Sequence, residues 1–313
     1  MPQPNRSRSA NTVLASNFIR TADGTDLFYR DWGTGAPLLF LAGWTLESSM
    51  WGYQMQPLSS RFRCIAYDRR GHGRSGDPGR GYDFDTLADD LAMVLDTLGL
   101  RQVVVVAHSL ASGEIVRYLT RYGTARVAGV VMVAPAAIPY LARTPDNPIG
   151  IDPETLRANL AELTEDFPGW AERRSAAYFG GKGSQGIINA TLVMMNRTSH
   201  QAAVELAHLQ ASTDFRSELT RLNTPIRFIH GSRDASAPIE LTSIPAFSLV
   251  RNAEIIVYDN APHGLYYTEK ALLNRDISDF ARAALRWPPA CLREIDSAHA
   301  AIHAPFKDSC DPQ

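Results

Sequence analysis

The chain is poor in the features that mark several classes of protein. It has only three cysteines in 313 residues, and their spacing matches no metal site. No apolar run approaches the length of a membrane span, and the polar residues 1–16 lack the apolar segment of a secretory signal. A net charge of −2 argues against nucleic acid as a partner. We therefore expect a cytoplasmic protein with no metal, membrane or nucleic-acid partner, and with homo-oligomerisation left open.

The amino-acid composition is typical of a globular protein. The chain is 45% hydrophobic and 20% charged, which suits one large α/β domain with an insertion. Cys64 lies in a strand-like run and is expected in the core. Cys291 and Cys310 flank the C-terminal segment and could pair, but in a cytoplasmic protein we expect free thiols.

Hydrophobic periodicity predicts strands that alternate with helices. The expected strands lie near residues 17–21, 26–31, 37–42, 62–67, 102–107, 127–133, 226–230 and 254–258. The expected helices lie near residues 84–98, 110–122, 239–246 and 268–286. This order is typical of an α/β fold with a doubly wound, mostly parallel sheet that begins antiparallel.

The alternation lapses between residues 135 and 219, where helical signals dominate. Asp152-Pro153-Glu154 resembles a helix start, Gly180–Gly183 breaks the pattern, and residues 187–209 have a helical pattern. We expect a helical cap over 135–219, inserted into a core of residues 17–134 and 220–286. Residues 1–16 are expected to form a flexible N-terminal arm and 287–313 a C-terminal tail.

The segment Val103–Gly113 carries the strongest chemical signal. A run of valines ends at Ala107, Ser109 follows two residues later, and a helical pattern then begins. A serine on such a sharp turn is lifted above the sheet, near the N–H groups of the helix N-terminus. The motif usually reads G-x-S-x-G, but Ala107 and Ala111 stand at the glycine positions. The alternative is a buried serine at a strand–helix junction.

An acid and a histidine follow in the chain order that such a nucleophile requires. Asp234 comes just past the seventh expected strand, and His263 lies in a Pro/Gly-rich loop after the eighth. A neutral imidazole can take the serine proton, and a carboxylate fixes the imidazole tautomer. Asp259 and Asp68 also follow strands, but Asp259 is too near His263 along the chain to orient its ring. Taken singly, Asp234 could instead cap a turn, and His263 could bond to backbone.

The third expected strand ends in a turn that suits an oxyanion hole. Gly43 follows a small residue there, which lets backbone N–H groups face the cleft. The expected donors are the N–H groups of Trp44 and of Leu110, the residue after the serine. The Trp44 side chain is expected to contact the acyl group, although it could simply be a packing residue.

Together these residues resemble the branch of the α/β-hydrolase superfamily that holds cofactor-free haloperoxidases, perhydrolases and aryl esterases. The resemblance covers about residues 17–285 and is carried by Ala22–Thr25, Tyr29–Gly33, Ala42–Trp44, Tyr67–Ser75, Tyr82-Asp83, Leu87–Leu91, Gly113-Glu114, Arg117-Tyr118, Gly123–Val127, Thr213–Phe215 and Ala261–Leu265. It implies an α/β-hydrolase fold, a small-molecule substrate and no cofactor. It also implies that Ser109 is the nucleophile, Asp234 the acid and His263 the base, with Trp44 and Leu110 as oxyanion donors.

The chain departs from that branch at two motifs. The branch usually has His-Gly-Trp-Pro in the oxyanion loop, where this chain has Ala42-Gly43-Trp44-Thr45. It usually has Gly-His-Ser-Met-Gly-Gly at the serine turn, where this chain has residues Ala107–Ser112. The proline is associated in the branch with perhydrolysis, in which peroxide replaces water. Because Thr45 restores an N–H and loosens φ, we expect esterase, lactonase or amidase chemistry over peracid formation. We also expect a Thr45→Pro substitution to raise perhydrolysis relative to hydrolysis.

Substrate contacts are expected mainly from the cap, in a mostly apolar pocket. The candidates are Thr45, Phe167, Trp170, Tyr178, Phe179, Met194, Met195 and Leu265, although the cap residues among them could only pack its underside. His72, His108 and His230 are expected to be structural. We expect a serine hydrolase that cleaves an uncharged, largely hydrophobic ester or lactone through an acyl-enzyme on Ser109. The alternatives are a lactam, amide or carbon–carbon bond hydrolase with the same triad, a slow-turnover ligand receptor, and a pseudoenzyme.

Overall fold

A computed structural model describes residues 17–285 of the chain. The predicted arm 1–16, the tail 287–313 and the state of Cys291 and Cys310 lie outside the described residues. Within this part of the chain, no helix is long and apolar enough to cross a membrane.

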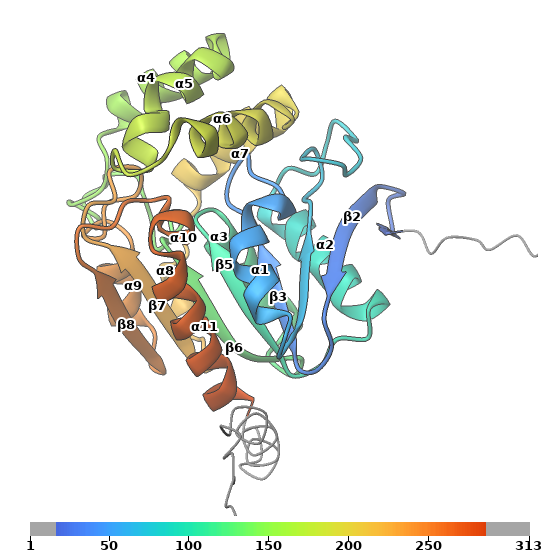
Figure 1. Cartoon of the computed structure of the whole chain (residues 1–313). Helices are drawn as coiled ribbons and strands as arrows, with labels where there is room; N and C mark the ends of the chain where they lie inside the picture. The colour runs from blue at the N-terminus through green and yellow to red at the C-terminus, as the bar shows by residue number, and fades with distance from the viewer. Residues whose placement is uncertain (1–16, 286–313) are drawn as a thin grey trace, which may run out of the picture.

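The eight predicted strands are present and form one sheet, in the order β1-β2-β4-β3-β5-β6-β7-β8 (Figure 1). They are β1 (Phe18–Arg20), β2 (Asp26–Trp32), β3 (Pro37–Leu41), β4 (Arg63–Tyr67), β5 (Val103–His108), β6 (Val127–Val133), β7 (Ile226–Gly231) and β8 (Ala253–Tyr258). β2 pairs antiparallel with both β1 and β4, whereas all pairings from β4 through β3 to β8 are parallel. The prediction of a mostly parallel sheet with an antiparallel start is confirmed.

The valine run of β5 explains why this strand lies at the centre of the sheet. Val103, Val105 and Ala107 join the apolar core on one face. Val104 and Val106 join the core on the other. Because successive side chains of a strand point to opposite faces, a strand covered by helices on both sides must be apolar throughout.

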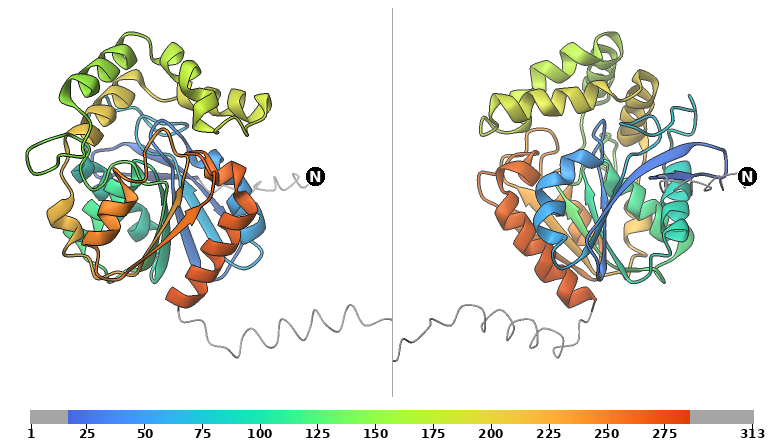
Figure 2. Two further views of the ribbon diagram at one scale, coloured as in Figure 1. Left: turned by 90° about the vertical axis from the view of Figure 1, so that its left-hand side faces the viewer. Right: turned by 45° about the vertical axis from the view of Figure 1, so that its right-hand side comes forward.

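Helices cover both faces of this sheet (Figure 2). One face is covered by α2 (Phe84–Thr97), α3 (Ala111–Tyr122) and α9 (Ser243–Leu249), and the other by α1 (Gly52–Leu58) and α11 (Lys270–Ala284). The expected helix 239–246 begins later, because residues 239–242 form turns after Pro238. The expected helix 268–286 corresponds to α11, and a short helix, α10 (Leu265–Thr268), precedes it. A short 3-10 helix, Ser48–Trp51, precedes α1.

Five helices lie between β6 and β7 in the chain, and Figure 1 shows the first four of them above one end of the sheet. They are α4 (Pro153–Glu165), α5 (Phe167–Tyr178), α6 (Gln185–Asn196) and α7 (His200–Ser212). Asp152 caps α4 as expected, since its carboxylate accepts from the N–H groups of Glu154 and Thr155. We refer to α4–α7 as the cap.

The continuous helical run expected over 187–209 is wrong in one respect. The chain leaves the helix between α6 and α7, where the Ser199 N–H donates to the Gly71 carbonyl of the core at 2.8 Å. The short helix α8 (Arg216–Leu219) packs against α3 and α9 and thus belongs with the core helices. The domain boundaries at 135 and 219 stay a prediction.

Candidate active site

Ser109 occupies the sharp turn between β5 and α3. Its φ is 56°, a left-handed conformation that non-glycine residues rarely adopt. The Ser109 N–H donates to the Val133 carbonyl at 3.1 Å, which ties the turn to the end of β6. Ala107 and Ala111 on either side are completely buried. The backbone therefore presents the serine side chain at the carboxyl edge of the sheet, where open α/β sheets place their sites.

The structure brings Ser109, His263 and Asp234 into one hydrogen-bonded chain. Ser109 Oγ lies 3.0 Å from His263 Nε2. His263 Nδ1 lies 2.7 Å from Asp234 Oδ2. The three residues follow β5, β7 and β8, and each is 4–6% exposed. This is the arrangement in which a carboxylate orients an imidazole that can take a serine proton.

The rival acids lie elsewhere. Asp259 contacts Ser232 and Asn260 in an exposed turn. The Asp68 carboxylate accepts from the N–H groups of Ser48 and Arg74. Neither carboxylate bonds to His263.

Four donors hold the Asp234 carboxylate in place. Oδ1 accepts from the N–H groups of Ser236 and Ala237, at 2.9 and 2.8 Å. Oδ2 accepts from His263 and from His230 Nε2, the latter at 3.1 Å. Burial by itself would raise the pKa of Asp234, but a protonated His263 and the hydrogen bonds from His230 and His263 lower it well below its ordinary value. The carboxylate therefore stays ionised.

Two of the histidines expected to be structural touch the Ser–His–Asp chain. His230 Nε2 faces two acceptors, Asp234 Oδ2 and the Ala237 carbonyl, so this nitrogen carries the proton. His108 Nε2 faces the His263 carbonyl at 3.2 Å. Burial, together with the charge of a protonated His263, lowers the pKa of His108 to about 3, so its ring is neutral. Sequence reasoning assigned both residues only structural roles, and position along the chain gave no signal for these contacts.

The loop after β3 lies against the serine turn. A Cβ on Gly43 would lie 2.5 Å from His108 Nδ1 and 3.4 Å from Ser109 Cβ, so only glycine allows this approach. The Leu46 N–H donates to the Gly43 carbonyl at 3.2 Å and closes a turn over residues 43–46. Among residues 17–285, neither the Trp44 N–H nor the Leu110 N–H has an acceptor. Both expected oxyanion donors are thus free to bind a ligand atom.

Thr45 has a backbone conformation that proline cannot adopt. Its φ is 59°, as required at the third position of a type II turn, and its hydroxyl donates to the Trp44 carbonyl at 2.7 Å. Proline holds φ near about −65° and cannot adopt this conformation. A proline at position 45 would therefore rebuild the turn in addition to removing an N–H. The expectation that threonine loosens φ relative to proline agrees with this conformation.

A cavity of about 560 Å³ opens above Ser109 and beneath the cap. Of the predicted pocket residues, five line it: Thr45, Trp170, Tyr178, Phe179 and Met195. Trp44, Ser109 and His263 also form part of its wall.

The other three predicted pocket residues do not line this cavity. Phe167 packs against Trp44 and Trp170 within the cap. The Met194 sulfur instead accepts from the Ser49 hydroxyl. Leu265 is fully buried in the core beside α11. These are corrections, because a side chain near the site in sequence can point away from it on its helix.

Helix α4 supplies a wall that the sequence reasoning missed. Leu156, Leu160 and Leu163 line the cavity, and their i, i+4, i+7 spacing was a readable signal of one apolar helix face. Apart from the two histidines, Arg174 is the one charged residue among the lining residues. Its guanidinium is paired with Glu162 at 2.9 Å and lies 4.5 Å from the centre of the Trp170 ring. The wall therefore presents no unpaired charge.

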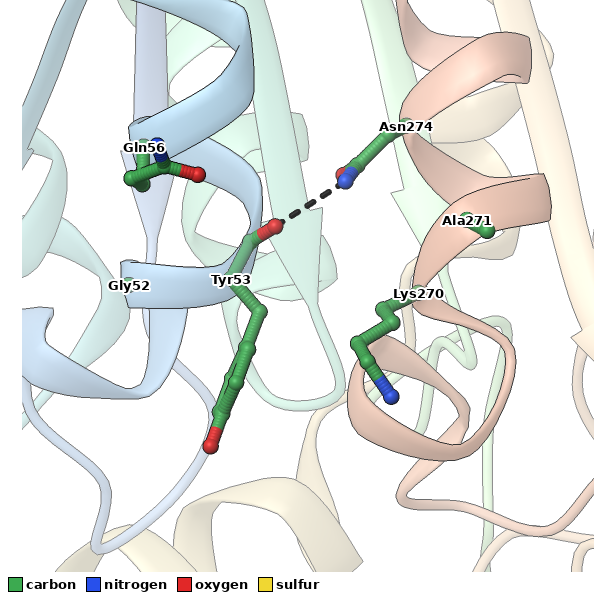
Figure 3. Close-up of a pocket in the computed structure, with 6 residues that line it drawn as sticks. All are labelled: Gly52, Tyr53, Gln56, Lys270, Ala271 and Asn274. Carbon is green, nitrogen blue, oxygen red and sulfur yellow. Dashed lines mark hydrogen bonds between the residues drawn. The ribbon is translucent and has the colours of Figure 1, made fainter.

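A second hollow, of about 540 Å³, lies between α1 and α11 (Figure 3). It is open and lined by Gly52, Tyr53, Gln56, Lys270, Ala271 and Asn274. The Asn274 amide donates across it to the Tyr53 carbonyl at 2.9 Å. None of the predicted site residues lies there. Within the described part of the chain, no cluster of three His, Cys, Asp or Glu side chains could hold a metal ion.

The fold and the Ser–His–Asp geometry can be compared with those of known protein families. The family model described as alpha/beta hydrolase fold matches residues 36–270. The chain therefore belongs to the α/β-hydrolase fold family.

Within that family, the chain lies in the haloperoxidase-like branch. It is 37% identical over 270 residues to a non-heme haloperoxidase of Rhodococcus erythropolis, covering 84% of this chain and 98% of that protein. It is 34% identical over 283 residues to a bifunctional esterase/perhydrolase of Acinetobacter calcoaceticus, covering 85% and 99%. The crystal structure of a bromoperoxidase from Bacillus anthracis matches with a TM-score of 0.81 at 29% identity, covering 85% of this chain and 99% of that one.

Proposed function

We propose that the protein is a serine hydrolase that cleaves an uncharged, largely hydrophobic ester or lactone. The observation that carries this proposal is the hydrogen-bonded chain from Ser109 through His263 to Asp234 at the floor of an apolar cavity. The esterase activity named for the Acinetobacter relative supports the same reaction class.

The chemistry follows from the geometry. His263 donates its Nδ1 proton to Asp234, so Nε2 has a free lone pair for the Ser109 hydroxyl proton. As Ser109 Oγ attacks the acyl carbonyl, His263 takes this proton, and the carbonyl oxygen becomes an oxyanion. The free N–H groups of Trp44 and Leu110 receive that oxyanion.

The tetrahedral intermediate then collapses to an acyl-enzyme. The bond to the alcohol oxygen breaks, and the alcohol leaves with the proton that His263 returns. In the second half, His263 takes a proton from water, whose oxygen attacks the acyl carbon. The bond from the acyl carbon to Ser109 Oγ then breaks, His263 returns the proton to Oγ, and the acid is released. With a lactone, the alcohol stays attached to the acyl group until this second step frees the hydroxy acid.

The cavity indicates the substrate class. About 560 Å³ is an ordinary volume for a small-molecule site. Its wall is formed mainly by Leu, Ala, Trp, Tyr and Phe side chains, and the Arg174 charge is already neutralised. An ionised acyl group would lose its hydration there without gaining a partner, so a neutral apolar acyl part is favoured.

A panel of esters, lactones and amides tests the proposal, with the Ser109→Ala variant as the matched control. We expect turnover of aryl esters and a loss of about 10⁴-fold or more in kcat for Ser109→Ala. A fluorophosphonate should label Ser109 stoichiometrically in the wild type and not at all in the variant. Near-wild-type turnover by the variant would remove Ser109 from the mechanism, and labelling without turnover of any panel member would favour a ligand receptor.

A further inference from the structure

A buried ion pair connects the serine turn with the oxyanion loop. Arg69 and Glu114 are 3% and 0% exposed, and Arg69 Nη2 lies 2.6 Å from Glu114 Oε2. Arg69 Nε reaches the same oxygen at 2.9 Å, and the Tyr67 hydroxyl bonds to the other carboxylate oxygen. Glu114 is on α3, which begins at Ala111, two residues after Ser109. The pair is therefore anchored to the helix that follows the serine turn.

The same guanidinium binds the backbone of the loop after β3. Arg69 Nη2 donates to the Ala42 carbonyl at 2.9 Å, and Nη1 points at the Gly43 carbonyl at 3.4 Å. A guanidinium is planar and rigid, so one group that bonds to Glu114 and to two successive carbonyls fixes their relative positions. Glu114 fixes the position of the guanidinium, and the guanidinium fixes the loop together with the Leu46 N–H, which donates to the same Gly43 carbonyl at 3.2 Å.

The Gly43 carbonyl matters because of the peptide bond to which it belongs. A peptide unit is planar and trans, so the Gly43 C=O and the Trp44 N–H point in opposite directions and turn together. An interaction that turns the Gly43 carbonyl oxygen towards Arg69 therefore also turns the Trp44 N–H away from Arg69. That N–H has no acceptor within residues 17–285.

We propose that Arg69, held by Glu114, is a positioning residue that aims the Trp44 N–H at the oxyanion. The guanidinium also polarises the peptide unit, because a positive charge on the carbonyl oxygen makes the N–H of the same amide a stronger donor. This inference rests on the proposed function, since it concerns the oxyanion of that reaction. The role is indirect: Arg69 touches the loop and not the substrate.

The chain offers a matched control in the next residue. Arg70 is 2% exposed and forms a similar buried pair with Asp90, at 2.6 and 2.7 Å. Its other contacts are with Asp23 and with the Arg80 carbonyl. None of these groups belongs to residues 42–46. The two pairs thus share burial and chemistry, and only the first touches the oxyanion loop.

The test compares two double variants, Arg69→Gln/Glu114→Gln and Arg70→Gln/Asp90→Asn. Each removes both charges of a pair, because removal of one partner would leave a buried, uncompensated charge. Thermal unfolding of both variants measures the structural damage. We expect comparable losses of stability, so a difference in catalysis cannot be assigned to folding.

For Arg69→Gln/Glu114→Gln we expect kcat on an aryl ester to fall about 10- to 100-fold. This loss is smaller than the roughly 10²- to 10³-fold fall in kcat that deletion of an oxyanion donor causes. The KM should stay within about threefold, and the midpoint of the pH–rate profile should not move, because His263 keeps its partners. Affinity for a trifluoromethyl ketone, which forms an oxyanion adduct with a serine, should fall by the same factor as kcat/KM. The control variant should change each quantity less than about threefold.

Equal losses in the two variants, or an unchanged trifluoromethyl ketone affinity, would overturn the inference and leave the proposed function standing. A shifted pH midpoint would also overturn it, since Arg69 would then act through His263. If the wild type hydrolyses nothing, the proposed function fails. The inference is then decided by the crystal structure of Arg69→Gln/Glu114→Gln, where an unrotated peptide unit between residues 43 and 44 would refute it.

Discussion

The Asp234→Asn substitution tests the candidate site most sharply, because the structure determines how the new amide must lie. Oδ1 of Asp234 accepts from the N–H groups of Ser236 and Ala237, at 2.9 and 2.8 Å. Only the oxygen of an asparagine amide can accept these bonds. The amide nitrogen is therefore forced into the place of Oδ2, facing His263 Nδ1 and His230 Nε2.

An amide nitrogen in that place reverses the hydrogen bond to His263. It donates where the carboxylate accepted, so Nδ1 of His263 must give up its proton and Nε2 must carry one. Nε2 lies 3.0 Å from Ser109 Oγ, and once protonated it can no longer take the serine proton. Changing the tautomer in this way typically lowers kcat by about 10⁴, which corresponds to about 5.5 kcal/mol of transition-state stabilisation.

The assay is kcat/KM for a p-nitrophenyl ester at neutral pH, with Asp259→Asn as the control. Asp259 also follows a strand, but it is exposed and makes no bond to His263. We expect the control to stay within about twofold, since exposed substitutions away from a site rarely matter. If Asp234→Asn kept a tenth of the wild-type rate, or Asp259→Asn proved the more damaging change, the assignment of the acid would be refuted.

Two further predictions use features that lie outside the Ser–His–Asp chain. Thr45→Pro should lower the rate of ester hydrolysis by at least about tenfold, because φ must move from 59° to near −65°. Thr45→Gly should lose much less of this rate, because glycine adopts a positive φ without strain. Equal rates for the two variants would contradict this prediction. Burial, together with the charge of Arg69, lowers the pKa of His72 from 6.5 to about 3. The unfolded chain therefore binds a proton between these pH values that the folded chain does not, so stability falls as the pH drops from 6.5 towards 3. His72→Gln should make the slope of unfolding free energy against pH shallower by about 1.4 kcal/mol per pH unit; identical slopes in denaturant titrations between pH 4.5 and 6.5 would count against this.

Much of the fold could be predicted from the sequence, because the hydrophobic pattern of a strand or helix depends on residues that are close together in the chain. The all-apolar β5 and the alternating strands and helices follow from burial on both faces of the sheet. The order Ser109, Asp234, His263 predicted one hydrogen-bonded chain, because each residue follows a strand of one parallel sheet. Parallel strands bring their carboxyl ends to one edge, so separations of 154 and 29 residues along the chain become hydrogen-bond distances.

Other features depend on contacts between segments that have no common pattern. The break between α6 and α7 follows from the bond between Ser199 and Gly71. The conformation of Thr45, on which the perhydrolysis argument depended, is a property of the turn that Gly43 and Leu46 close.

The sequence by itself determined where the strands lie along the chain and the residue types at the candidate site, since these depend on burial and on position relative to a strand end. Only the tertiary structure decided which way side chains and peptide units point. It separated Met195, which lines the cavity, from its neighbour Met194, which contacts Ser49. It also placed Arg69 against the peptide unit that carries the Trp44 N–H. The physical reason is that orientation depends on all the groups packed around an atom, and these come from segments that the chain order does not connect.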